Sequence, residues 1–258
     1  MKRHALGQHY LTDPDVVDRM ISAAKVGKDE SVVEIGTGEG ALTQRLAGLC
    51  ARLDGYEVDR ENYEKTVARV AGANAFIHLA DGFSPRKAFD VLVSSLPYSR
   101  SQDFVEWISQ ARYDRAVVLL QEDFVRKVMA PPGDRDYRAV SATAQISSEI
   151  EVLGRVSRDA FRPPPRVNSL MVAVRPKVRL SGREVSNIKE LFSLRRREVS
   201  SALAHFGLRG EGASYQRRRV YSLAPAEVHE ICGGRAARDL SSRRKAAAWS
   251  PKASPSHS

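Results

Sequence analysis

The sequence predicts an α/β fold, in which helices cover both faces of an open parallel sheet, followed by a small basic helical part. Three observations favour this fold. Strand-length and helix-length apolar segments alternate over the first two thirds of the chain, a glycine-rich turn joins one such strand to a helix, and the composition shifts near Pro176. The 258 residues, 42% of them hydrophobic, suffice for one large domain and one small domain.

The expected elements follow one another regularly. Asp13 and Pro14 are typical of a helix start and precede an apolar stripe. Strands are expected at 31–36, 51–58, 75–79, 90–95 and 115–121, and helices at 40–48, 60–70, 101–111 and 122–129. Two later strands, 149–153 and 169–174, flank the proline-rich segment 161–165, because proline lacks an N–H and cannot continue either strand. Beyond Pro176 we expect only helices, at 184–206 and 224–232.

The composition excludes several classes of protein. No segment approaches the ~18–20 apolar residues of a membrane span. The amino terminus is basic but has no apolar signal core, so we expect a cytoplasmic protein that does not contact a membrane. Cys50 and Cys232 are far apart and have no metal-type spacing, which favours free thiols in a reducing compartment and no metal site.

The net charge of +10 is concentrated in the last third of the chain. Residues 178–258 contain 16 Lys and Arg against 7 Asp and Glu, a net charge of +9, whereas residues 1–177 contain 25 against 24. Two arginine triplets, Arg195–Arg197 and Arg217–Arg219, favour contacts with the phosphates of a polyanionic partner. A solvated basic face is the alternative interpretation.

Polar or glycine residues stand at the end of each of four successive expected strands. The first strand runs into Glu34–Gly40, a Gly-x-Gly-x-Gly turn that lets the backbone approach a ligand. Glu57 follows about twenty residues later, where dinucleotide-binding folds place the acid that holds ribose hydroxyls. Asp81 ends the third strand, and Ser95 ends the fourth. Because open α/β sheets bind ligands at the carboxyl ends of their strands, the pattern predicts a nucleotide-type cofactor, although a single glycine turn also fits a purely structural role.

Ser95-Leu96-Pro97-Tyr98 resembles the Asn/Asp-Pro-Pro-Tyr motif of amino-group methyltransferases. In that chemistry an exocyclic amine, whose lone pair is delocalised into the base, attacks the methyl group of S-adenosylmethionine. A side-chain oxygen and a backbone carbonyl that accept the two N–H groups favour the nucleophilic form, and they stabilise it most in the transition state. Pro97 fixes the turn so that the Leu96 carbonyl can point into the site. A proline turn with Tyr98 as a packing residue is an equally good interpretation of the tetrapeptide alone.

The resemblance extends in order from about residue 3 to 240. Leu6–Leu11 is similar to the Gly-Gln-Asn/His-Phe-Leu opening of the KsgA-type small-subunit rRNA adenine dimethyltransferases, Phe161–Ser169 to their Phe-x-Pro-x-Pro-x-Val-x-Ser motif, and Leu191–Arg197 to their Phe-x-x-Arg-Arg-Lys helix. The resemblance implies a seven-stranded Rossmann-like class I methyltransferase sheet with a small helical C-terminal domain. It also implies the cofactor S-adenosylmethionine and the dimethylation of adjacent adenines in a small-subunit rRNA hairpin. We therefore expect a monomer with a catalytic domain at 1–177, a basic RNA-binding domain at 178–240 and a disordered tail at 241–258.

The same resemblance implies the roles of individual residues. The cofactor-binding residues would be Gln8, His9, Leu11, Gly36, Gly38, Glu57, Asp81 and Ser95. Among these, His9 and Leu11 would close over the cofactor, Glu57 would hold its ribose, and Asp81 would read its adenine amine. The catalytic residues would be Ser95, Leu96, Pro97, Tyr98 and Phe161. Tyr98 and Phe161 would sandwich an adenine that has left its stack.

Two departures from the family pattern keep alternatives open. Ser95 replaces the family's Asn, and its shorter side chain offers a rotating hydroxyl instead of an amide carbonyl. The segment Tyr137–Ser141 replaces Tyr-Gly-Arg-Leu-Ser and so moves or loses an arginine near the expected RNA surface. An Erm-type large-subunit rRNA methyltransferase is one alternative. A weakly active or inactive ribosome-assembly factor, comparable to the mitochondrial transcription factor B proteins in its use of the fold, is another, and a NAD dehydrogenase is a weaker one.

Overall fold

The computed structural model describes residues 9–71, 73–84, 88–206 and 215–233. The strands are β1 (Tyr10–Leu11), β2 (Ser31–Ile35), β3 (Arg52–Glu57), β4 (Ala75–Leu79), β5 (Val91–Ser95), β6 (Arg115–Gln121), β7 (Ser148–Val156), β8 (Phe161–Arg162) and β9 (Ser169–Pro176). The helices are α1 (Pro14–Ala24), α2 (Ala41–Ala47), α3 (Arg60–Arg69), α4 (Ser101–Ile108), α5 (Glu122–Val128), α6 (Ala139–Ser147), α7 (Gly182–Ser193), α8 (Val199–His205) and α9 (Pro225–Gly233). Within these ranges no helix is both long and apolar enough to cross a membrane.

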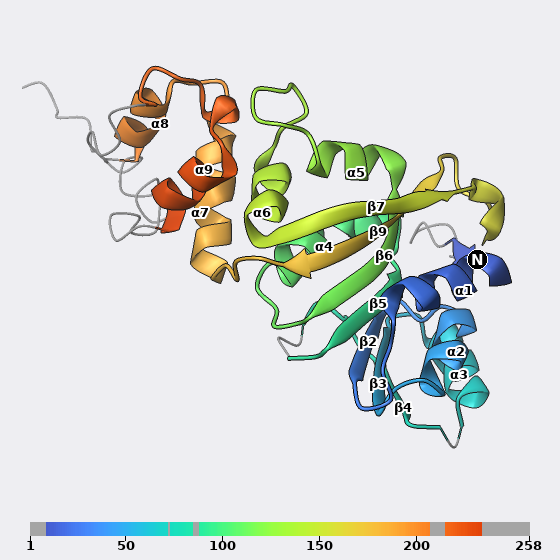
Figure 1. Ribbon diagram of the computed structural model, residues 1–258. Coiled ribbons are helices and arrows are strands. Elements are labelled where there is room, and N and C mark those ends of the chain that lie inside the picture. The colour runs from blue at the N-terminus through green and yellow to red at the C-terminus, as the bar shows by residue number, and fades with distance from the viewer. Residues whose placement is uncertain (1–8, 72, 85–87, 207–214, 234–258) are drawn as a thin grey trace, which may run out of the picture.

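Seven strands form one sheet in the order β4-β3-β2-β5-β6-β9-β7 (Figure 1). Strands β2 to β6 are parallel, whereas β9 is antiparallel to β6 and β7 is antiparallel to β9. The predicted seven-stranded α/β fold is therefore confirmed, but the expectation of a wholly parallel sheet is wrong at this edge. The connection 157–168 between β7 and β9 contains three prolines and no α-helix, so it cannot make the crossover that a parallel neighbour needs.

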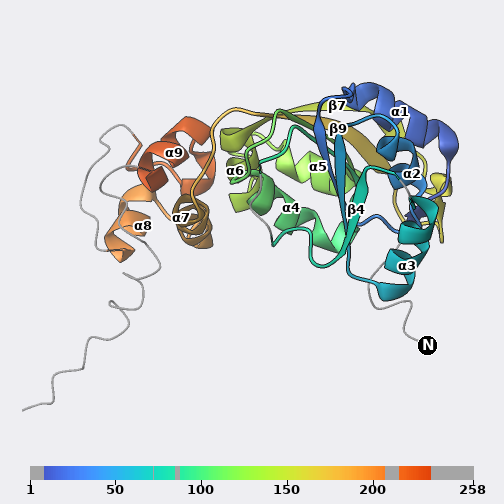
Figure 2. The same ribbon diagram turned by 90° about the horizontal axis from the view of Figure 1, so that it is seen from below.

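The strands send alternate apolar side chains to two separate cores. Val32 and Leu53 face the core that α1 and α2 cover, whereas Val33 and Leu92 face the core that α4 and α5 cover. Figure 2 shows these helices as layers on the two sides of the sheet, as the alternating sequence pattern predicts. Helix α3 packs beside β4 at the edge of the sheet.

Helices α7, α8 and α9 lie beyond α6 at one end of the molecule (Figure 1). The sequence analysis did not predict α6, which belongs to the third apolar core together with the C-terminal helices. Tyr137, Ala142 and Ile146 contribute to this core from the amino-terminal side of residue 177. The division into domains at 177 and 240 therefore stays a prediction, since the core that supports the C-terminal helices contains residues from both sides of the first boundary.

The predicted helix 184–206 is wrong in one respect, because α7 and α8 are separated by residues 194–198. The backbone there binds a second segment instead of continuing the helix. Val199 donates its N–H to the Arg218 carbonyl at 2.9 Å, and Val220 donates to the Arg197 carbonyl at 3.0 Å. These bonds place the two arginine triplets side by side.

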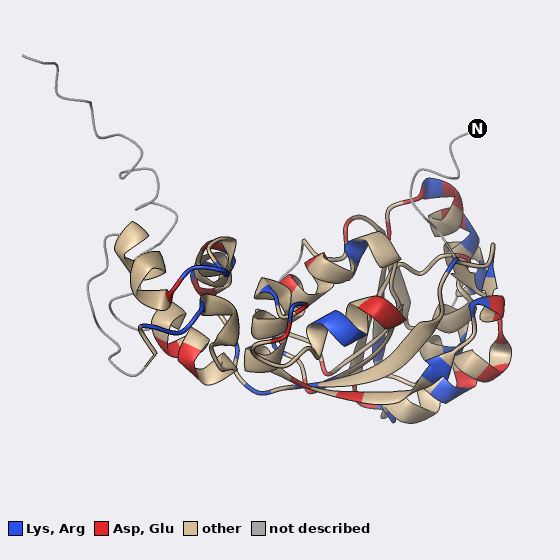
Figure 3. Cartoon of the chain, turned by 90° about the horizontal axis from the view of Figure 1, so that it is seen from above, with Lys and Arg blue, Asp and Glu red and all other residues tan. Residues whose placement is uncertain are grey.

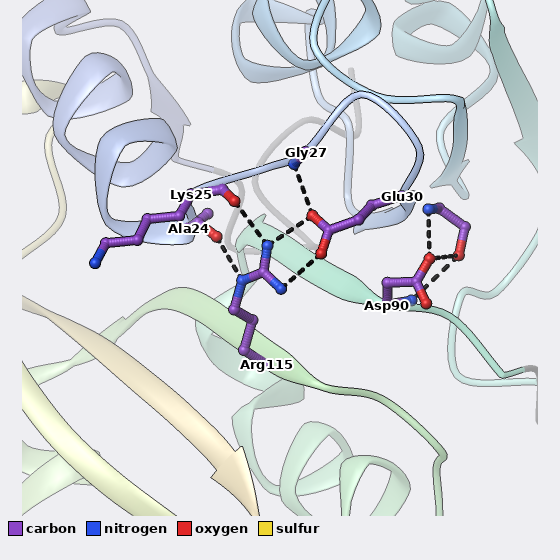
Figure 4. A network of polar contacts seen from close by, with 7 residues as sticks. Ala24, Lys25, Gly27, Glu30, Asp90 and Arg115 are labelled. Carbon is purple, nitrogen blue, oxygen red and sulfur yellow. Dashed lines mark hydrogen bonds and ion pairs between the residues drawn. The ribbon is translucent and has the colours of Figure 1, made fainter.

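Arg115 on β6 ties the amino ends of the central strands to the end of α1 (Figure 4). Its guanidinium donates to the Ala24 and Lys25 carbonyls at 2.7 and 2.8 Å and to the two Glu30 carboxylate oxygens at 2.8 and 2.6 Å. Glu30 also accepts the Gly27 N–H at 2.7 Å. The hydrogen bond from Arg115 lowers the pKa of Glu30, so this carboxylate stays ionised. The network holds the loop before β2 at the edge of the sheet opposite the strands' carboxyl ends.

We predict that Arg115→Ala lowers the free energy of unfolding by about 2 kcal/mol, because the substitution leaves a partly buried carboxylate and two carbonyls without their donor. Urea unfolding followed by circular dichroism measures the change. Arg126→Ala is the matched control, since Arg126 is 73% exposed and pairs with Glu122 within one helix; we expect it to cost at most about 0.5 kcal/mol. Equal midpoints for the two variants would contradict the role given to Arg115.

Candidate active site

A pocket opens at the carboxyl ends of β2, β3, β4 and β5, where the strand-end pattern predicts ligand binding. The predicted site residues that line it are His9, Gly36, Gly38, Glu57, Asp81, Ser95 and Pro97. Five segments that are distant in the sequence thus meet at one edge of the sheet. Gln8, another predicted site residue, lies outside the described residues.

The glycine turn after β2 forms the floor of the pocket. Gly36 and Gly38 have φ angles of 77° and 55°, which residues with side chains rarely adopt. A Cβ atom at Gly36 would lie 3.2 Å from Pro97, and one at Gly38 would lie 3.1 Å from the Tyr10 ring. Only glycine therefore leaves the backbone both in this conformation and open to a ligand.

Glu57 at the end of β3 is preorganised by the backbone. One carboxylate oxygen accepts the Gly38 N–H at 2.8 Å, and the other accepts the Val58 and Asp59 N–H groups at 2.9 Å each. The residue is only 5% exposed, and this burial raises the pKa of Glu57 against the opposing effect of the three backbone donors. Because Oε2 accepts only the Gly38 N–H among the described residues, the fixed carboxylate keeps acceptor capacity there for a hydroxyl of a ribose.

Glu34 lies directly beneath the glycine turn on β2. Its side chain is 1% exposed, and burial raises its pKa to about 8. This carboxyl is therefore mostly protonated at neutral pH, and it adds little negative charge beside Glu57.

Asp81 follows β4 and lines the pocket. Its Oδ1 accepts the Phe83 N–H at 3.0 Å, and Arg100 donates to its two oxygens at 3.3 and 3.0 Å. Burial acts to raise the pKa of Asp81, but the Phe83 N–H and the Arg100 guanidinium outweigh it and lower the pKa. The group is thus an ionised acceptor that can take a hydrogen bond from an amine.

Ser95, Pro97 and Tyr98 follow one another where β5 ends. Ser95 and Pro97 line the pocket, and Tyr98 begins the short 3-10 turn Tyr98–Arg100. The Tyr98 hydroxyl lies 2.5 Å from the Ser169 hydroxyl on β9, and its ring centroid lies 5.6 Å from that of His9. Burial raises the pKa of Tyr98, so its phenol stays protonated. The turn therefore places the Ser95 hydroxyl at the pocket and the Tyr98 ring beside His9, which also lines the pocket.

Leu11, a predicted cofactor-binding residue, does not line the pocket, and its contact with a cofactor stays a prediction. Successive residues of a strand face opposite sides, so in β1 the Tyr10 side chain faces the glycine turn, whereas Leu11 is 7% exposed and lies in the core. Strand β1 instead pairs with β8, where Leu11 is opposite Phe161. Tyr10 is the residue that the sequence analysis missed here.

The predicted sandwich of an adenine between Tyr98 and Phe161 stays a prediction, although the two rings are neighbours. Phe161 is 1% exposed, and the two ring centroids lie 6.3 Å apart with an interplanar angle of 66°. Inclined rings leave no parallel slot for a base between them. Phe161 belongs to the core that α1 and α2 cover, and its ring packs edge-on against that of Tyr98.

The sequence analysis missed two further residues of the site. Arg100 lines the pocket, and Ser169 binds the Tyr98 hydroxyl. Ser169 is the last residue of the Phe-x-Pro-x-Pro-x-Val-x-Ser match, so the motif contained a signal for it. Arg100 stands two residues after Tyr98 and carries no motif signal, which is why only the structure identifies it.

The fold and the pocket together define a class I methyltransferase. Two solved structures share the fold: a dimethyladenosine transferase from Plasmodium falciparum has a TM-score of 0.73 at 21% identity and covers 86% of this chain and 96% of its own. The 23S rRNA methyltransferase ErmE has a TM-score of 0.59 at 24% identity, with coverage of 87% and 99%. The glycine floor, the Glu57 carboxylate and the 55% exposed Val58 beside it suit the methionine, ribose and adenine parts of S-adenosylmethionine.

The model of the ribosomal RNA adenine dimethylase family matches residues 1–231, and the chain belongs to this family. A probable ribosomal RNA small subunit methyltransferase A from Pyrococcus abyssi is 33% identical over 239 residues, which span 88% of this chain and 89% of the relative. The ribosomal RNA small subunit methyltransferase A from Thermotoga maritima is 30% identical over 236 residues, which span 90% of this chain and 84% of the relative. The predicted resemblance, the enzyme class and the cofactor S-adenosylmethionine are thereby confirmed, and the dehydrogenase alternative is wrong.

We predict that Glu57→Ala abolishes S-adenosylmethionine binding, because it removes the ribose acceptor and also frees the Gly38 N–H that holds the glycine turn. Isothermal titration calorimetry measures the affinity, and thermal melting verifies that the variant is folded. Glu64→Ala, at a 64% exposed position on α3, is the control and should bind normally. Unchanged affinity in Glu57→Ala would show that the cofactor lies elsewhere.

Proposed function

We propose that this enzyme transfers methyl groups from S-adenosylmethionine to the N6 atoms of adjacent adenines in a hairpin of small-subunit rRNA during ribosome biogenesis, acting as a monomer in the cytoplasm. The observation that carries the proposal is the position of the turn at Ser95–Tyr98: Ser95 and Pro97 line the cofactor pocket, and the Tyr98 ring lies beside His9, which also lines it. The names of the relatives, small-subunit rRNA methyltransferases A, support the choice of RNA.

The target adenine is held by residues at the end of β5. S-adenosylmethionine supplies the methyl group. The Ser95 hydroxyl and the Leu96 carbonyl accept the two N–H groups of the adenine amine, and this arrangement favours the form whose lone pair is free to attack. Ser94 cannot replace Ser95, because its side chain is fully buried and donates to the Ile35 carbonyl at 2.5 Å. Tyr98 stacks on the base, and its ring is fixed by Ser169.

Ser95 limits the rate of this reaction in our proposal. A serine hydroxyl rotates freely and reaches less far than an asparagine amide, so the amine is held less firmly in the transition state. The loss of one preorganised contact of this kind costs roughly 2.7–4 kcal/mol in other enzymes. The cofactor contacts of Gly36, Gly38, Glu57 and Asp81 do not depend on this side chain.

The RNA would bind the basic surface formed by the two arginine triplets, which lie side by side in the C-terminal part (Figure 3). Arg218 and Arg219 are partly used within the protein, since Arg218 pairs with Glu227 at 2.7 Å and Arg219 donates to the Arg196 carbonyl. In the described parts of the chain, Arg196, Arg197 and Arg217 have no acidic partner within 4.0 Å. These three side chains are therefore available for phosphates.

Arg138 lies close to the arginine triplets but is partly buried, and its Nη1 atom is shielded from solvent. Arg138 stands one position before the arginine of the family pattern. Its charge still acts on Arg195, because burial, Arg138 and Arg196 together lower the pKa of Arg195. Arg195 in turn donates to the Arg135 carbonyl at 3.3 Å. The departure in this segment thus moves the arginine but keeps its charge close to the Arg195–Arg197 triplet.

The function is tested by methyl transfer from labelled S-adenosylmethionine to undermethylated small ribosomal subunits, with large subunits and naked rRNA in parallel. We expect dimethyladenosine in the small-subunit RNA by nucleoside mass spectrometry, and a rate about tenfold or more higher for Ser95→Asn, because the amide restores a fixed acceptor. Product on the large subunit would instead indicate an Erm-type enzyme. No product from the native chain, with activity gained in Ser95→Asn, would indicate an assembly factor.

We predict that RNA affinity falls steeply with rising salt concentration. Replacing three arginines together by Ala, namely Arg196, Arg197 and Arg217, should reduce the slope of log K against log[salt] by about 3, because each phosphate contact contributes about 0.9. Filter binding or fluorescence anisotropy over a salt series measures the slope. Arg60 and Arg126, which are 76% and 73% exposed, serve as control substitutions far from the triplets. A flat salt dependence in the native protein would show that the basic face is merely solvated.

A further inference from the structure

Arg100 forms one wall of the cofactor pocket and is held there by three groups. Its Nη2 donates to Asp81 Oδ2 at 3.0 Å, and its Nε donates to Asp103. The guanidinium carbon lies 4.8 Å above the centroid of the Phe83 ring, which is a cation–π arrangement. The side chain is 34% exposed, so it lies at the surface of the pocket and not inside the core.

These contacts also fix Asp81. The Phe83 N–H and Arg100 together bind both carboxylate oxygens from one side, and a carboxylate bound at two points cannot rotate freely. About four lone-pair positions are available on a carboxylate, so Asp81 keeps acceptor capacity toward the pocket. The pair therefore presents an acceptor in a set orientation.

We propose that Arg100 is a positioning residue for the cofactor, which holds Asp81 in the orientation that receives the adenine amine of S-adenosylmethionine. This inference rests on the proposed role of Asp81. Arg100 acts on cofactor affinity and on the discrimination of adenine from hypoxanthine, whose oxygen cannot donate to a carboxylate. It does not touch the transferred methyl group, so it does not act on the chemical step.

If Arg100 had a purely structural role, its loss would lower the melting temperature of the protein. The side chains of Arg100, Asp81 and Asp103 are 34%, 42% and 52% exposed, and ion pairs at that exposure contribute little to stability. The loss of Arg100 should therefore leave the melting temperature almost unchanged, and its effect should be confined to the cofactor.

The test uses the full-length enzyme and the variants Arg100→Ala, Arg100→Lys and Asp81→Ala, with Arg126→Ala as the matched control. Calorimetry gives the affinities for S-adenosylmethionine, S-adenosylhomocysteine and S-inosylhomocysteine, and steady-state assays give KM and kcat. For Arg100→Ala we expect the affinity for S-adenosylmethionine to fall about tenfold and the KM to rise about tenfold, because Asp81 loses its charge-assisted contact with Arg100. The kcat should stay within about twofold. The preference for the adenosyl over the inosyl ligand should fall by a similar factor.

Arg100→Lys should recover only part of the affinity, because lysine keeps the charge but not the planar fork that spans Asp81 and Asp103. An unchanged affinity in Arg100→Ala together with weakened binding in Asp81→Ala would overturn this inference while leaving the proposed site intact. Tighter binding in Arg100→Ala would also overturn it, by showing that Arg100 competes with the cofactor for Asp81. Normal binding in both variants would overturn the proposed role of Asp81 as well.

Discussion

The contact between the Glu57 carboxylate and the Gly38 N–H is the interaction on which the rest of the site depends. It joins the end of β3 to the glycine turn that follows β2, with 2.8 Å between the Gly38 nitrogen and Glu57 Oε2. The turn then holds Gly36 against Pro97 and Gly38 against Tyr10, so two other segments are placed relative to one carboxylate. Burial of Glu57 strengthens these electrostatic contacts because water does not compete for them.

The strand order explains why this single contact can organise so much. Strand β2 lies between β3 and β5, which is the position where the direction of winding reverses in an open sheet. The glycine turn is therefore the neighbour of Glu57 on one side and of Ser95 on the other. The same position joins the proposed cofactor half of the site to the proposed target half.

Much of the fold could be predicted from the sequence because it is recorded in local patterns. The five parallel strands and the helices between them follow from apolar periodicity, and the strand-end residues Glu57, Asp81 and Ser95 follow from their spacing. What failed depends on contacts between distant segments. The break between α7 and α8 is set by hydrogen bonds to the segment at 218–220, and the burial of Phe161 is set by its pairing with Leu11.

The two halves of the site differ in how they are fixed, and this difference explains where the chain can depart from its family. The proposed cofactor half is held by backbone donors on Glu57 and on Asp81, with the Arg100 side chain as a further partner of Asp81, and substitutions of neighbouring side chains leave the backbone donors in place. The target half is held by side chains, namely Ser95 itself and the Tyr98–Ser169 pair. Both departures noted in the sequence, Ser95 and Arg138, concern the base or the RNA surface. A chain of this kind can therefore change how it handles its RNA while its cofactor pocket stays the same.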